Sequence, residues 1–114
     1  MEKPSPEAVT LFEEVAEDLR TRHGGVTTGP MFGSPSLKLQ GKVIAGVYGD
    51  TMVFKLEGDD HAQALALPGA HLFEPMEGRA MKAWVQVPSA QAAEWDDLAE
   101  RAYVRLAAEL GLAT

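Results

Sequence analysis

The spacing of apolar residues changes twice along this chain of 114 residues: it is helical near the start, alternating in the middle and helical again at the end. Ser5 and Pro6 form a typical helix start, and Gly24-Gly25 is a typical helix end. We expect the last helix to be capped by Ser89 and ended by Gly111. Its apolar stripe comprises Trp95, Leu98, Ala99, Ala102, Leu106 and Leu110. Both helices need a second layer to cover their apolar faces.

The middle segment, from Val26 to Leu56, is typical of an antiparallel meander, because short alternating runs are separated by glycine-containing turns. Gln40-Gly41 is the first expected turn. Gly49-Asp50 is the second, because glycine accepts the positive φ that a hairpin turn requires. The run that follows it places Met52 and Phe54 on one face of a strand.

A short helix is expected from His61 to Leu67, with Asp59 or Asp60 as its cap, and two further strands at 71–74 and 81–87. The order of elements is then helix, meander, short helix, hairpin and long helix. This order predicts an α+β fold, a two-layer sandwich in which a mostly antiparallel sheet of five to six strands carries the N- and C-terminal helices on one face. No linker or repeat divides the chain, so we expect one domain over residues 1–114.

The composition narrows the classes of function. The formal net charge is -7, which repels nucleic-acid backbones, so direct nucleic-acid binding is not expected. Lys38, Lys42 and Lys55 form a basic cluster that would share one face if their strands pair; we interpret them as solvated strand residues that protect sheet edges. No signal peptide and no run of about 20 apolar residues is present, so we expect a cytoplasmic protein without membrane contact. The absence of cysteine suits a reducing compartment.

No catalytic or metal-binding motif is evident. The spacings of His23, His61 and His71 match no metal motif, and no catalytic triad, phosphate loop or dinucleotide fingerprint is present. We therefore expect no catalytic residue, no metal and no cofactor, and a protein that is not an enzyme. A minor enzyme that uses a histidine and a nearby acid remains an alternative.

Two segments contain the candidate groove residues, which would contact a ligand or a partner: Met31, Phe32, Gly33, Arg79, Met81 and Trp84. Methionine side chains adapt to different contacts, so one hypothesis is an apolar pocket with Arg79 at its mouth, binding a small ligand through its guanidinium. The structural alternative is that the methionines fill the core, that Phe32 and Trp84 fasten the interior, and that Arg79 pairs with Glu74, Glu77 or a helix C-terminus.

The order of short motifs resembles a known family. Met31-Phe32-Gly33 follows a helix, Gly41-Lys42 lies in an apolar hairpin, and Phe54-Lys55 ends a strand. Later come Phe73-Glu74-Pro75 and a Gly-Arg-x-Met run from Gly78 that leads to Trp84 and Val87-Pro88. Together they resemble the N-terminal domain of the TfoX (Sxy) competence-regulator family over about the whole chain.

The resemblance differs in two respects from the family pattern. Ser34-Pro35 stands where the family often has a second glycine, and the chain stops at Thr114, so we expect a stand-alone member without the family's C-terminal domain. The resemblance implies a non-enzymatic regulatory module that contacts a protein partner, with competence or transcription regulation as the implied setting. Homodimerisation through a strand edge or the surface near Tyr48 is a further possibility that the sequence leaves open.

Overall fold

The structure is a computed structural model and describes residues 3–31 and 33–112. Its elements in chain order are α1 (Pro6–Arg22), β1 (Val26–Met31), β2 (Ser34–Leu39), β3 (Lys42–Tyr48), β4 (Thr51–Lys55), α2 (Gly58–Leu65), β5 (His71–Met76), β6 (Arg79–Pro88), a 3₁₀ segment (Ser89–Glu94) and α3 (Trp95–Glu109).

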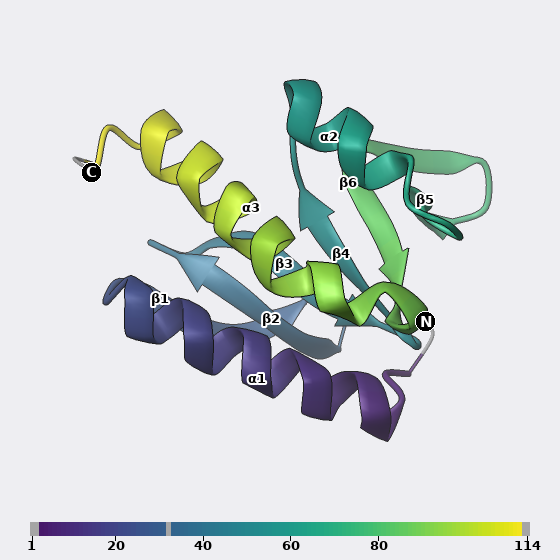
Figure 1. Ribbon diagram of the computed structural model, residues 1–114, viewed down its shortest axis with the longest axis horizontal. Helices are drawn as coiled ribbons and strands as arrows, with labels where there is room; N and C mark the ends of the chain where they lie inside the picture. Colours follow the sequence, from purple (N-terminus) through teal and green to yellow (C-terminus); the bar gives the residue numbers. More distant parts are fainter. Residues whose placement is uncertain (1–2, 32, 113–114) are drawn as a thin grey trace.

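One sheet organises the described residues. Its six strands have the order β1-β2-β3-β4-β6-β5, and every pair of neighbours is antiparallel. Figure 1 shows α1 and α3 on the same face of this sheet, while α2 lies beside β6 at one end. The prediction of an α+β fold, with an antiparallel sheet and both terminal helices on one face, is confirmed.

The main core lies between this face of the sheet and the two long helices. Its most buried side chains include Phe12, Leu19, Leu37, Val47, Met52, Phe54, Val85, Trp95 and Leu106. Alternation along β4 places Met52 and Phe54 in this core and Val53 on the opposite face. On β3 the register shifts, so that Ile44 is an extra residue and joins Ala45 in the core.

The turn between β3 and β4 holds the starts of two helical segments. Gly49 has a φ of 59°, as expected for a two-residue hairpin turn, and Asp50 follows it. The Asp50 carboxylate accepts hydrogen bonds from the hydroxyl of Ser5 at 2.7 Å and from that of Ser89 at 2.6 Å. The backbone N–H groups of Ser5 and Ser89 also donate to this turn. These hydrogen bonds, from Ser89 first and then from Ser5, lower the pKa of Asp50.

The expected helix start at Ser5 is confirmed, because its hydroxyl accepts from the N–H of Ala8 at 3.1 Å. The expected cap at Ser89 is wrong. Ser89 begins the 3₁₀ segment, which bends at Gln91, and α3 starts only at Trp95. The Ser89 hydroxyl instead donates a hydrogen bond to Asp50, because the β3–β4 hairpin turn lies close to it. No local sequence pattern reveals this proximity.

The boundaries of the short helix also differ from the prediction. α2 starts at Gly58, with Glu57 in the capping position and no side-chain cap. Neither Asp59 nor Asp60 is therefore the cap. Asp60 instead forms an ion pair with Arg101 of α3, which also binds Asp97 one turn earlier at 2.8 Å.

Within the described residues, no helix has the length and apolar character needed to cross a membrane.

We predict that Ser5→Ala lowers the free energy of unfolding by about 1 kcal/mol, the usual effect of losing an N-cap. Asp50→Ala should cost more, because it removes the acceptor of both serine hydroxyls. The pKa of Asp50 is lowered in the folded state, so its contribution is present at neutral pH and is lost as the pH falls below the ordinary aspartate value of 3.8.

Urea denaturation of the wild-type and variant proteins at pH 7 and under acidic conditions measures this contribution. Asp59→Ala is the matched control, since Asp59 is an exposed aspartate in the first turn of α2. Equal effects of Asp50→Ala and Asp59→Ala at pH 7 would contradict the role of the turn.

Candidate functional site

The face of the sheet opposite α1 and α3, called here the helix-free face, carries a second apolar cluster. Tyr48, Val53 and Phe73 form its buried centre, and the half-buried side chains of Met31, Met81 and Trp84 pack against them. Tyr48 and Phe73 meet edge to face, with ring centroids 4.9 Å apart. Three of the candidate groove residues are thus brought together, on strands from both halves of the chain.

Two backbone features create this cluster. The pairing of β5 with β6 shifts between Leu72 and Phe73, where the partner changes from Val85 to Met81. The resulting bend allows Met81 and Trp84, three residues apart, to contact the same cluster. On β3, Gly46 has no side chain, which leaves space for the side chain of Met31. A Cβ at this position would lie only 2.8 Å from the Met31 methyl group.

The other candidate groove residues lie apart from the cluster or outside the description. Gly33 is exposed in the turn between β1 and β2 and has a φ of 77°, which favours glycine. Arg79 is exposed at the start of β6, and among the described residues it forms no ion pair. Glu74 instead accepts a hydrogen bond from the N–H of Gly78 at 2.9 Å. Phe32 falls outside the described residues.

Trp84 does not belong to the main core, where Trp95 is the fully buried tryptophan. The expectation that Trp84 fastens the interior is therefore replaced by its place in the second cluster. The reason is the parity of β6: Val85 and Val87 face the helices, so Trp84 must face the other way.

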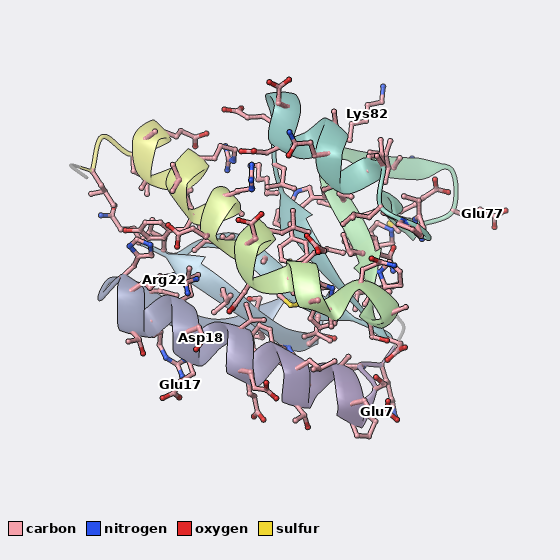
Figure 2. The ribbon with its side chains drawn as sticks, viewed as in Figure 1. Glu7, Glu17, Asp18, Arg22, Glu77 and Lys82 are labelled. Atoms are coloured by element: carbon pink, nitrogen blue, oxygen red, sulfur yellow. The ribbon has the colours of Figure 1, made fainter. Side chains whose placement is uncertain are left out.

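Charge is separated between the two layers. Lys38 and Lys55 lie on the helix-free face, because their neighbours Leu37 and Phe54 point into the main core. Lys42 lies on the helix side, with its Nζ 4.0 Å from a carboxylate oxygen of Glu109, so the basic cluster does not share one face. Five acidic residues lie on α1, and none on β1, β2, β3, β4 or β6. Figure 2 shows Glu7 and Glu17 projecting from α1 away from the sheet.

A hollow of about 210 Å³ lies between α1 and the start of α3. Its apolar wall includes Leu11, Val15, Ala92 and Trp95, and its acidic wall includes Glu14, Asp18 and Asp96. Burial raises the pKa of Asp96, and the adjacent Asp18 carboxyl raises it further, whereas Arg22 acts in the opposite direction. The structure therefore brings together two carboxyl groups that disfavour simultaneous ionisation.

This hollow is not evident from the sequence. In the sequence, Asp18 lies among the other acidic residues of its helix and Trp95 belongs to the apolar stripe of the last helix. Asp18 and Asp96 meet because α1 and α3 pack side by side in a particular register, and no sequence spacing encodes that register. The nearest signal is the acidic pair directly after Trp95, Asp96-Asp97, but helix starts commonly carry such pairs.

The three histidines take part in separate contacts. His23 Nε2 lies 2.9 Å from a carboxylate oxygen of Glu100, which also accepts from Arg22 at 3.0 Å, and the His23 ring stacks on Tyr103. Burial alone would raise the pKa of Glu100, but these hydrogen-bonded neighbours lower it overall. The other two, His61 and His71, each contact a backbone carbonyl oxygen. Among the described residues, no group of three or more His, Asp or Glu side chains could hold a metal ion.

Comparison with known protein families identifies a match. A family model described as the TfoX N-terminal domain matches residues 18–109. No curated protein and no solved structure matches the chain. The matched range contains the whole sheet, α2 and α3, together with the end of α1 that carries Asp18 and Arg22.

We predict that Asp96→Asn stabilises the protein at pH 7. The pKa of Asp96 is raised in the folded state, so its ionisation costs stability as the pH rises through the folded value, and the cost is absent below the unfolded value. The gain from the variant should therefore disappear on acidification. Thermal denaturation across this pH range measures it.

Asp97→Asn is the matched control, because Asp97 is the neighbouring aspartate and is paired with Arg101. It should lower stability by about 0.3–0.5 kcal/mol, as expected for a helical ion pair. A loss of stability at pH 7 in Asp96→Asn would contradict the interpretation of the Asp18–Asp96 contact.

Proposed function

Because the chain belongs to the TfoX N-terminal domain family, we propose that it is a non-enzymatic regulatory module that binds a protein partner through its helix-free face. The resemblance to this family suggests that the module acts in the regulation of competence or transcription. The binding surface is inferred from the chemistry of this face alone, since function belongs to sites rather than to folds.

The observation that carries the proposal is the apolar cluster on the helix-free face. An antiparallel sheet with helices on one side usually presents polar residues on the other. Here Met31, Met81 and Trp84 are half-exposed on that side. Tryptophan and methionine are enriched in protein interfaces, where a few such side chains supply most of the binding energy. Met76, on the adjacent strand β5, is a further exposed apolar side chain, with 64% of its surface accessible.

The charges beside the cluster indicate the chemistry of the partner. Lys55 is directly opposite Trp84 in the β4–β6 register. Lys38 lies over Gly29, since its Nζ is 3.2 Å from the point that a Cβ at residue 29 would occupy. Neither lysine forms an ion pair within the parts of the chain that the structure describes. A complementary partner would present apolar side chains flanked by carboxylates.

Other features support the same proposal. The acidic helix layer argues against a nucleic-acid partner, because the net charge of -7 repels phosphates at long range. A chain without cysteine suits the reducing cytoplasm, which we propose as its location.

The edge strands β1 and β5 each contain a proline, Pro30 and Pro75, which disfavours pairing through the edges. The helix-free face is therefore the preferred contact surface.

We predict that a photo-crosslinking residue at position 81 forms an adduct with a distinct protein in native cells. The same residue at position 104 is the matched control, because Val104 is 46% exposed on α3, in the other layer. With the purified partner, Lys38→Glu combined with Lys55→Glu should weaken binding by about tenfold or more, measured by calorimetry.

Lys3→Glu combined with Lys42→Glu makes the same change of net charge away from the helix-free face and should leave affinity nearly unchanged. Circular dichroism of each variant verifies the fold. Adducts that form equally from positions 81 and 104 would contradict the proposed surface. An adduct of twice the chain mass would identify a second copy as the occupant, and a nuclease-sensitive adduct a nucleic acid, and either would overturn the proposal.

A further inference from the structure

The sulfur atoms of this chain are unevenly placed. The sequence has five methionines and no cysteine, so its oxidisable sulfur is in thioethers. Met52 is fully buried in the main core. Met31 and Met81 are half-buried and pack against the cluster on the helix-free face, and Met76 is largely exposed on β5. The thioethers that an oxidant in solution can reach therefore include two that belong to this cluster.

The Met31 side chain reaches from β1 to β3. Its methyl group lies over Gly46, where an added Cβ would approach it to 2.8 Å. On the strand between them, the small residue Ser36 is opposite Gly29 on one side and Gly46 on the other. The Met31 thioether therefore links two strands that share no backbone hydrogen bonds, and it does so by packing alone.

Met81 brings the second thioether to the cluster. It is paired with Phe73 in the β5–β6 register, and the Phe73 ring meets that of Tyr48 edge to face. A thioether beside aromatic rings makes favourable contacts because its sulfur is polarizable and apolar. Met31 and Met81 come from opposite halves of the chain, so the packing of the cluster depends on both thioethers remaining apolar.

Two polar side chains of the same face are already hydrogen-bonded. Ser36 Oγ donates to the carbonyl oxygen of Gly29 at 2.7 Å, and Gln86 Nε2 donates to the hydroxyl of Thr51 at 3.0 Å. A sulfoxide oxygen is a strong acceptor, and burying it without a donor is unfavourable. An oxidised methionine of this cluster would therefore leave the apolar contacts and place its sulfoxide in water.

We propose that Met31 and Met81 form a reversible oxidation switch that opens the apolar cluster on the helix-free face. The oxidant is a hydroperoxide: the sulfur lone pair attacks one peroxide oxygen, an S–O bond forms and the O–O bond breaks. Sulfur loses two electrons to the peroxide, and the leaving oxygen takes up the proton of the transferred oxygen and departs as water or an alcohol. Methionine sulfoxide reductases reverse the change. Control of partner binding by this switch rests on the function proposed above, whereas the opening of the cluster does not.

Dilute hydrogen peroxide added to the purified protein tests the opening of the cluster without a partner. Peptide mass mapping should find sulfoxide at Met31 and Met81, as well as at the exposed Met76, while the buried Met52 stays reduced. A methionine sulfoxide reductase mixture should then remove the sulfoxides.

The two tryptophan indole resonances in a ¹H–¹⁵N spectrum report on the two sides of the sheet, and Trp84→Phe assigns them. Trp84 packs in the cluster, so its resonance should shift on oxidation and return after reduction. Trp95 is fully buried in the main core, so its resonance should stay in place.

Met31→Leu combined with Met81→Leu keeps the cluster apolar at similar volume but removes its sulfur, so the Trp84 resonance should no longer respond to peroxide. Met76→Leu is the matched control and should respond as the wild type does. With the purified partner, oxidation should weaken binding of the wild type by about tenfold or more and leave the double leucine variant nearly unaffected.

Three results would overturn the inference. One is complete oxidation of Met76 while Met31 and Met81 stay reduced. Another is sulfoxide at Met31 and Met81 without a shift of the Trp84 resonance, which the wild-type protein alone reveals. The third is a Trp84 shift that persists in the double leucine variant. A cluster that opens while the partner stays bound would instead contradict the proposed binding surface and leave the switch in place.

Discussion

The Asp50 carboxylate joins three parts of the chain that are far apart in sequence. It accepts hydrogen bonds from Ser5, at the start of α1, and from Ser89, at the start of the 3₁₀ segment that leads into α3. α1 and the 3₁₀ segment before α3 therefore begin at the same hairpin turn, which links the positions of the two helices over the sheet. The register of Asp18 against Asp96, and of Arg22 against Glu100, depends on this common origin.

The two layers have different chemical characters. The helices carry most of the carboxylates, whereas the helix-free face presents Lys38 and Lys55 beside the cluster of Trp84 and its neighbours. A net charge of -7 describes the chain as a whole but not this face. The two sides of the molecule therefore offer a partner surfaces of different electrostatic character.

Local signals predicted the elements whose stabilising contacts are near in sequence. The Ser5 cap and the Gly49-Asp50 turn were both identified, because each interaction spans at most four residues. The predictions failed where a distant segment competes for the same side chain. Ser89 bonds to Asp50 instead of capping α3, and Asp60 bonds to Arg101 instead of capping α2. In both cases a long-range partner replaced the local one.

The sequence by itself determined the α+β class, the order of the elements and the family, because hydrophobic periodicity and turn residues act over short distances. Only the tertiary structure placed Met31, Met81 and Trp84 in one cluster, since a bend in β6 and the missing side chain of Gly46 produce it. It also brought Asp18 against Asp96. Contacts between faces of distant elements depend on register and packing, which a pattern along one segment does not specify.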